Sequence, residues 1–217
     1  MRSALSLNQA AQLGDVATVQ SHLDAGVSVD QRTTGETALM GASYSGKTEV
    51  AELLLDRGAS VDMQDTKGWT ALMWACFRGW TEVARALLDR GAKIDTQDRD
   101  GFTALMRASF TGKKDAVALL VERGANLDLQ DKDGWTALHA AAHQGNFGCA
   151  TALIDSGADR IVPDNSGQNA AMVAEGRKYN ALGHLIMFGT QDARRRKPVH
   201  AGLVFFYAFV QARAHAQ

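Results

Sequence analysis

The segment Gly68-Trp69-Thr70-Ala71-Leu72-Met73 decides the fold, because the same pattern returns at a fixed distance along the chain. It reads Gly101-Phe102-Thr103-Ala104-Leu105-Met106 one unit later and Gly134-Trp135-Thr136-Ala137-Leu138-His139 in the next unit. The glycines that open these segments form a column with a spacing of 33 residues: Gly35, Gly68, Gly101, Gly134 and Gly167. A fixed period of this length is typical of repeat proteins, in which each unit packs only on its neighbours.

Two further columns of small residues run in register with the first. One consists of single glycines at Gly46, Gly79, Gly112 and Gly145. The other pairs Gly with Ala at Gly58-Ala59, Gly91-Ala92, Gly124-Ala125 and Gly157-Ala158, preceded by the variant Gly26-Val27. Glycine supplies the left-handed backbone that commonly ends a helix, so the two columns predict the ends of two short helices in every unit.

The residues before and inside these helices support the same prediction. A residue whose side-chain oxygen can accept the first amides of a helix precedes the first helix of each unit: Thr37, Thr70, Thr103, Thr136 and Asn169. The second helices carry an aliphatic column at Leu54, Leu87, Leu120 and Leu153 and a neighbouring one at Leu55, Leu88, Val121 and Ile154. No unit could bury these side chains alone, so stacking of the units is predicted to build a continuous core.

These residues resemble the ankyrin repeat, whose 33-residue period and Thr-Pro-Leu-His signature correspond to the columns above. The resemblance covers residues 1 to about 190, with Ala in place of the signature Pro and Met in place of its His in all but one complete repeat. It implies an all-α solenoid of helix-turn-helix units with β-hairpin finger loops and about six repeats. The predicted units are a divergent N-terminal cap at 1–31, complete repeats at 32–64, 65–97, 98–130 and 131–163, a degraded C-terminal cap at 164–190, and a basic then apolar tail at 191–217.

The predicted fingers carry one aspartate each, three residues before the repeat glycine: Asp65, Asp98, Asp131 and Asp164. A carboxylate at this place can accept the backbone amides of its own turn. One identical carboxylate per unit suits architecture better than a single active site, so we interpret these residues as turn-holders. The first finger is one residue shorter, since Gly26 to Gly35 is 9 positions and Gly58 to Gly68 is 10, and its tip is predicted to sit differently.

Aromatic residues gather in two columns that the ankyrin resemblance places on the concave side of the stack. One column follows the repeat glycine, and the other lies near the end of the first helix. The two columns form one strip, to which Trp74 and Arg107 add. Basic residues lie at the finger tips. Aromatic anchors with a charged rim are typical of a protein interface. The predicted partner-binding residues are Trp69, Phe102, Trp135, Tyr44, Phe77, Phe110, His143, Trp74, Arg107, Lys67, Arg99 and Lys132.

Two alternatives remain open for this strip. Aromatic side chains in these columns can instead pack on the neighbouring repeat. A buried Arg107 would need a carboxylate partner, whereas an Arg107 that faces the groove would meet the ligand. On the opposite face the second helices are rich in charge, and like-charged neighbours such as Glu52 and Asp56 argue against a regular set of ion pairs there.

No P-loop, GxGxxG, GxSxG or HExxH motif appears in the sequence, so no catalytic residue, enzyme activity or cofactor is predicted. His139 and His143 share one helix face, but two ligands without a third make a weak metal site, and none is predicted. A metal- or small-ligand-dependent regulator centred on this pair is kept as an alternative. Cys76 and Cys149 are interpreted as small buried hydrophobic residues.

Charge and hydropathy argue against two further classes of function. The net charge of −1 argues against a nucleic-acid binder, and no apolar stretch is long enough for a membrane helix. The tail combines Arg194-Arg195-Arg196-Lys197 with an apolar run at 203–210. We expect it to cover the last repeat or to join a second copy. The alternatives are membrane-surface contact through residues 194–210 and a nuclear-import or acidic-surface signal in the basic cluster.

These observations predict a non-enzymatic protein-protein interaction module that binds an unidentified partner protein as a scaffold, adaptor or regulatory inhibitor. The chain is expected to be a monomer, with a tail-mediated dimer as the alternative. Its two isolated cysteines and the lack of an N-terminal apolar segment favour the cytoplasm, or the nucleus if the host is eukaryotic.

Overall fold

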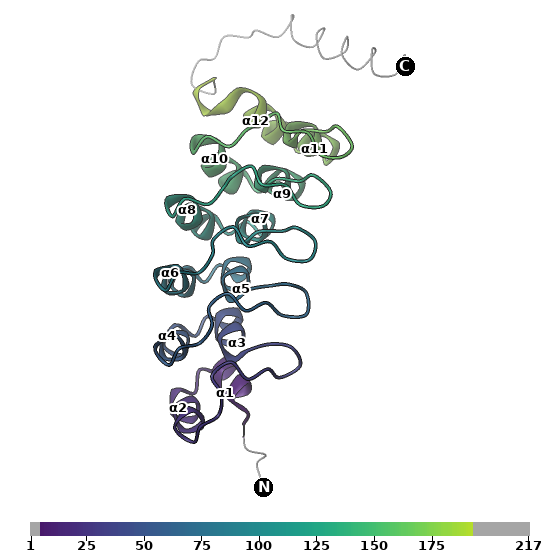
Figure 1. Cartoon of the computed structure of the whole chain (residues 1–217). Helices are drawn as coiled ribbons and strands as arrows, with labels where there is room; N and C mark the ends of the chain where they lie inside the picture. The colour runs from purple at the N-terminus through teal and green to yellow at the C-terminus, as the bar shows by residue number, and fades with distance from the viewer. Residues whose placement is uncertain (1–4, 193–217) are drawn as a thin grey trace, which may run out of the picture.

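The computed structural model describes residues 5–192, and within this range it forms an elongated stack of twelve helices (Figure 1). The helices follow one another in pairs, each pair joined by a tight loop: α1 Leu7–Leu13, α2 Val16–Asp24, α3 Ala38–Ser45, α4 Thr48–Asp56, α5 Ala71–Arg78, α6 Thr81–Asp89, α7 Ala104–Phe110, α8 Lys114–Glu122, α9 Ala137–Gln144, α10 Phe147–Asp155, α11 Ala170–Gly176 and α12 Asn180–Asp192. Each unit predicted from the sequence contains one pair, and α12 continues two residues past the predicted boundary at 190.

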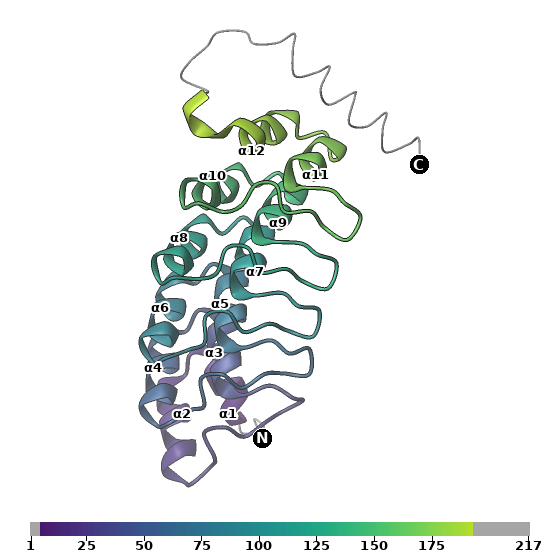
Figure 2. The same ribbon diagram turned by 45° about the horizontal axis from the view of Figure 1, so that its top comes forward.

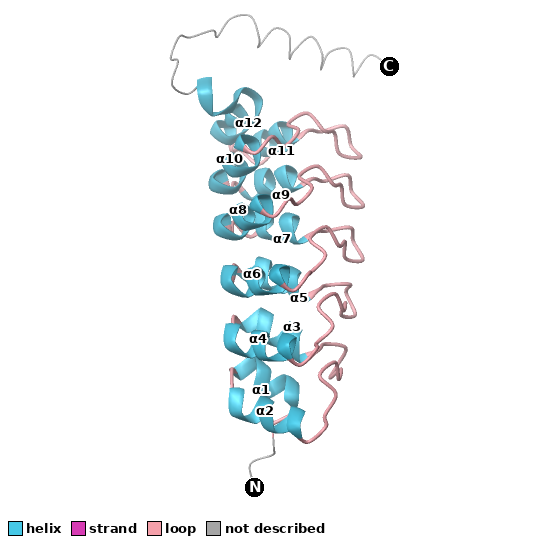
Figure 3. Cartoon of the chain, turned by 60° about the vertical axis from the view of Figure 1, so that its left-hand side comes forward, coloured by secondary structure: helices cyan, strands magenta, loops and turns pink. Residues whose placement is uncertain are grey.

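The helices form two layers (Figure 2). The odd-numbered helices contact one another in sequence and make the inner layer, while the even-numbered helices make the outer layer. The loops between the pairs project from the inner layer on one side of the stack (Figure 3). We call the surface made by the inner helices and these finger loops the inner face. It is the surface on which the sequence predicted a partner to bind.

The local signals that begin and end the inner helices act as predicted. The Thr70 hydroxyl accepts the Met73 amide at 3.3 Å at the start of α5, and equivalent bonds begin α3, α7 and α9. Asn169 caps α11 through its side-chain oxygen. Gly79 ends α5 with a φ of 82°, in the left-handed region that glycine adopts without steric cost.

The core follows the aliphatic column of the outer helices. Leu54, Leu87, Leu120 and Leu153 are all fully buried. Burying one leucine side chain contributes about 1.5–3 kcal/mol to folding, and each of these leucines lies among residues of the adjoining units. The second column is less protected, because Leu88, Val121 and Ile154 are half-buried. Stacking therefore supplies the core that a single pair of short helices lacks.

The finger loops are turns rather than the expected β-hairpins. Residues 5–192 contain no β-strand, and the isolated bridge between Thr33 and Glu36 is the sole β-type pairing in that range. In the second finger the Asp65 carboxylate accepts the amides of Lys67 at 2.7 Å and Trp69 at 2.9 Å. Asp98, Asp131 and Asp164 repeat these two bonds, which confirms their prediction as turn-holders.

Successive fingers are joined by a ladder of amide side chains. Gln64 donates to the carbonyl oxygen of Gly68 in its own finger and to that of Gln97 in the next finger, at 2.7 and 3.0 Å. Gln97 and Gln130 make the same pair of bonds in the following fingers. In the shortened first finger Arg32 takes this role and donates to Gly35 and Gln64. The predicted difference at the first tip is confirmed, since Thr34 adopts a positive φ of 54° there.

The outer face corrects one expectation, because its charges do form a regular set of ion pairs. Arg57, Arg90 and Arg123 pair with the aspartate of the preceding unit, at 3.2, 2.7 and 2.7 Å from Asp24, Asp56 and Asp89. The prediction considered neighbours within one helix, whereas these pairs run between repeats. All three are substantially exposed to solvent, so each contributes little to stability.

None of the helices described is both long and apolar enough to cross a bilayer. The basic cluster and the apolar run of the tail, and with them the predictions for residues 194–210, lie outside the described residues.

Candidate functional site

Four of the predicted partner-binding residues form one continuous group of rings on the inner face. Trp69 follows the turn of the second finger, Tyr44 lies on α3, and Trp74 and Phe77 lie on α5. Trp74 is 5.3 Å from Tyr44 and 4.1 Å from Trp69 between ring centroids, and Phe77 is 5.3 Å from Trp69. Most of these contacts are edge-to-face, a favoured geometry for aromatic pairs. We call these four residues the aromatic cluster.

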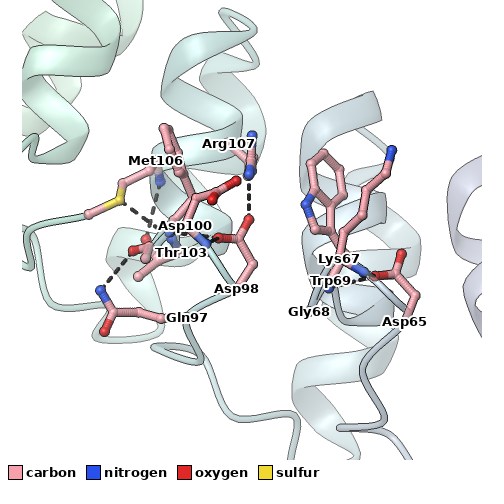
Figure 4. A network of polar contacts seen from close by, with 12 residues as sticks. Asp65, Lys67, Gly68, Trp69, Gln97, Asp98, Asp100, Thr103, Met106 and Arg107 are labelled. Atoms are coloured by element: carbon pink, nitrogen blue, oxygen red, sulfur yellow. Dashed lines mark hydrogen bonds and ion pairs between the residues drawn. The ribbon is translucent and has the colours of Figure 1, made fainter. Parts of the chain in front are cut away.

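Arg107 extends the aromatic cluster into the next unit. Its guanidinium lies over the rings of Trp69 and Phe102, 4.3 and 4.1 Å from their centroids. It also forms an ion pair with Asp98, the carboxylate of its own finger turn (Figure 4). Of the two alternatives for Arg107, the structure therefore shows the one with a carboxylate partner inside the chain, and the Arg107 side chain is half-buried. Planar stacking together with a carboxylate bond is a combination that Arg provides and Lys does not.

Trp74 occupies the position of Arg107 one repeat earlier and makes an analogous bond. Its indole Nε1 donates to the Asp65 carboxylate at 3.2 Å. In both units a side chain of the inner helix thus supports the finger through the turn-holding aspartate. In α3, α9 and α11 the residues at this position have no side-chain donor: Gly41, Ala140 and Val173.

The remaining aromatic residues form a second group, one repeat further along. His143 on α9 lies between Phe110 and Trp135, with ring centroids 6.1 and 5.0 Å away. Its Nδ1 is buried and has no hydrogen-bond partner in the described part of the chain. Burial lowers the pKa of His143, and the charge of Arg177 lowers it further. A neutral imidazole therefore belongs to this group at neutral pH.

Exposure separates the predicted anchors into two kinds. Trp69 is only 8% exposed, so it is a packing residue rather than the accessible anchor that the sequence predicted. The physical reason is that both Trp74 and Arg107 pack against its ring. Tyr44, in contrast, is 41% exposed. The other predicted aromatic residues and Arg107 are half-buried, and Lys67, Arg99 and Lys132 are exposed at the finger tips.

Two residues beside Tyr44 were missed by the sequence analysis. The Arg78 guanidinium lies 4.8 Å from the centroid of the Tyr44 ring, and Trp80 donates its indole hydrogen to the Tyr44 carbonyl oxygen at 2.9 Å. Trp80 is as exposed as Tyr44. Its signal in the sequence is a tryptophan in a column that otherwise holds Lys47, Lys113, Asn146 and Tyr179. We call Tyr44, Arg78 and Trp80 the exposed aromatic patch.

The histidine pair does not offer a metal site. His139 is buried, its Nδ1 accepts the Thr136 amide at 3.2 Å, and its Nε2 donates to the Gln168 carbonyl oxygen at 3.1 Å. Both ring nitrogens are thus occupied, and the bond from Nε2 to Gln168 links the last two units. No group of three potential ligands occurs within residues 5–192. Burial raises the pKa of Cys76 to about 12 and of Cys149 to about 11, so both thiols stay protonated.

Comparison with known proteins agrees with this architecture. The family model described as ankyrin repeats in three copies matches the chain in three overlapping segments, 7–98, 57–131 and 105–195. No curated protein matches the chain. The three segments together span most of the 217 residues and include all twelve helices of the described region. The chain therefore belongs to the ankyrin repeat family, whose repeats are generally protein-protein interaction modules and typically not enzymes.

Proposed function

We propose that this chain is a non-enzymatic protein-binding module that holds a partner protein on its inner face as a scaffold, adaptor or regulatory inhibitor. The observation that carries the proposal is the exposed aromatic patch at the C-terminal ends of two inner helices, where Tyr44 lies on α3, Arg78 ends α5 and Trp80 follows in the loop to α6. The Tyr44 and Trp80 side chains are both about two-fifths exposed, and Arg78 stacks on Tyr44. Tyr, Trp and Arg are the residues most enriched among those that dominate binding energy at protein interfaces.

The aromatic cluster beneath the patch gives it a fixed shape. Tyr44 contacts Trp74 edge-on, and Trp74 is in turn fixed by Trp69 and by its bond to Asp65. Side chains that are already ordered lose little conformational freedom when a partner binds. The patch is therefore preorganised by contacts within the chain, and the buried Trp69 contributes to binding as a support.

The finger tips supply a polar rim to the inner face, at the end of the inner helices opposite the exposed aromatic patch. Lys67, Arg99 and Lys132 are exposed, while their backbone atoms join consecutive fingers: the Arg99 amide donates to the Lys67 carbonyl oxygen at 3.1 Å, and the Lys132 amide to that of Asp100 at 3.0 Å. The charged side chains are thus carried by a hydrogen-bonded backbone. Rim charges of this kind affect association rate and partner choice more than affinity.

The proposal is tested by capturing partners from the native cell lysate with the full chain and with two variants. The first combines Tyr44→Ala with Arg78→Ala, which removes two of the three exposed side chains of the patch and leaves Trp69 in place. The second, Phe147→Ala, removes an equally exposed aromatic ring from outer helix α10 and serves as the matched control. Circular dichroism and thermal unfolding first establish that both variants fold.

Specific proteins captured by the full chain and by Phe147→Ala, but lost with the double variant, would support binding through the inner face. The same capture by all three chains would overturn it. A truncation at residue 190 separates binding through the repeats from binding through the tail, because only the former survives the truncation.

A further inference from the structure

The finger that carries Asp131 lacks the inner-helix donor that supports the aspartates of the two fingers before it. In the third and fourth units Trp74 and Arg107, at equivalent positions of the inner helix, bond to the carboxylates of Asp65 and Asp98. In the fifth unit the equivalent residue is Ala140, whose side chain carries no donor. Asp131 keeps the turn-holding bonds to Asp133 and Trp135 through Oδ1, but its Oδ2 receives no hydrogen bond from any residue between 5 and 192.

The repeat also reproduces the aromatic surroundings of Arg107. That guanidinium lies over Trp69 of one unit and Phe102 of the next. Thirty-three residues further on, the corresponding rings are Phe102 and Trp135, and both are half-buried. Two rings and a carboxylate are therefore repeated in the fifth unit, without the cation that joins them in the fourth.

The charges near Asp131 favour a cation. The negative charge of Asp133 raises the pKa of Asp131, and the carboxylates of Asp131 and Asp164 both raise the pKa of His139. Burial raises the pKa of Asp131, which is the expected effect on a carboxylate that lacks a bonded cation. The groups of opposite charge are His139, which lowers the pKa of Asp131, Lys132, which is exposed at the finger tip, and Arg177, which acts on His143.

We propose that an arginine side chain of the partner binds here, with its guanidinium between the rings of Phe102 and Trp135 and bonded to Oδ2 of Asp131. The proposal rests on the protein-binding function proposed above and specifies one side chain that the partner presents. Ala140 is only 1% exposed, so binding at this place requires the half-buried Trp135 ring, which contacts His143, to move aside for the guanidinium. Arginine is favoured over lysine because the rings and the carboxylate together match a planar group.

The test uses the ¹⁵N-labelled full chain and the peptide acetyl-Gly-Gly-Arg-Gly-Gly-amide, titrated by NMR. The indole N–H signal of Trp135 is assigned with Trp135→Phe. We expect this signal to shift saturably with the arginine peptide and to require about tenfold more of a peptide in which uncharged citrulline replaces arginine, since the ion pair and the cation-π contact are then lost.

Three variants locate the site. Asp131→Asn keeps an oxygen that accepts the two turn amides but loses the charge, and it is expected to weaken binding about tenfold. Asp133→Asn makes the same change of charge two residues away on the exposed tip, and it is expected to bind within about twofold of the unchanged chain. Ala140→Arg supplies the guanidinium from within, as Arg107 does in the unit before, and is expected to abolish the saturable shift.

Three results would overturn the proposal: no saturable shift of the Trp135 signal, equal binding of the citrulline peptide, or equal loss in Asp131→Asn and Asp133→Asn. A negative peptide titration leaves the proposed function standing if the Tyr44→Ala, Arg78→Ala variant still loses its partners. If neither experiment shows binding on the inner face, both the arginine site and the proposed function are refuted.

Discussion

Arg107 and Asp98 form an ion pair inside one repeat, and the carboxylate side chain is completely buried. The Arg107 guanidinium also lies over Trp69 of one finger and Phe102 of the next. Arg107, which the sequence suggested as a ligand contact, therefore connects two fingers within the chain. A buried carboxylate is tolerated because Arg107 and two backbone amides satisfy its oxygens.

Removing the cation of this pair should destabilise the chain. Arg107→Ala leaves Asp98 charged and buried with only its backbone partners, and the free energy of unfolding is expected to fall by about 2–3 kcal/mol. Urea unfolding followed by circular dichroism measures the loss. Arg78→Ala is the control, since Arg78 is exposed and its stacking on Tyr44 is worth about 1 kcal/mol or less. Equal losses of stability in the two variants would show that the buried pair contributes no more than the exposed contact of Arg78 with Tyr44.

The two kinds of aromatic residue should respond differently to truncation. Trp69→Ala removes a buried ring that contacts Trp74, Phe77 and Arg107, and is expected to cost about 3–5 kcal/mol of stability. Tyr44→Ala removes an exposed ring and should cost about 1 kcal/mol. Thermal unfolding of both variants decides the point, and a larger loss for Tyr44→Ala would contradict the assignment of Trp69 as a support.

Two neighbouring leucines of α6 should also differ in their contribution to stability. Leu87 is fully buried, and Leu87→Ala should leave a cavity that lowers the free energy of unfolding by about 2–5 kcal/mol. Leu88 is half-buried on the same helix, and its truncation should cost less than half as much. Denaturant titration measures the free energy of unfolding of both variants. Equal losses would mean that the core is not centred on the leucine column that contains Leu54 and Leu87.

His139 should make stability depend on pH. Burial lowers its pKa below the ordinary value of 6.5, and the Gln168 carbonyl and the carboxylates of Asp164 and Asp131 offset part of this effect. Because the unfolded chain then binds the proton more tightly, stability should be highest above pH 6.5 and decline as the pH falls through that value.

The control for this dependence is His139→Met, since methionine fills the same position in the three preceding units: Met40, Met73 and Met106. His143 has a lowered pKa as well but is present in both proteins, so the comparison isolates His139. The free energy of unfolding is measured from pH 8 to pH 5.5, and His139→Met should lose less of it over this range. Parallel curves for the two proteins would exclude a role for His139.

Much of the fold could be read from the sequence because its determinants are local and repeated. The Thr70 and Gly79 columns act within one turn of the chain, and Leu87 needs only to lie on the apolar side of its helix. The turn-holding role of Asp65 is likewise decided by amides two and four residues away. Patterns of this kind do not depend on how distant parts of the chain are arranged.

Tertiary structure alone decided which of the aromatic residues are accessible. Trp69 and Tyr44 look alike in sequence, but Trp69 is covered by Trp74 and by Arg107 from the next unit, whereas Tyr44 stays open beside Arg78 and Trp80. The ion pair of Asp56 with Arg90 was missed for the same reason, since it joins residues 34 positions apart. Exposure and pairing depend on the side chains that the neighbouring repeat brings into contact, and periodicity within one repeat does not contain that information.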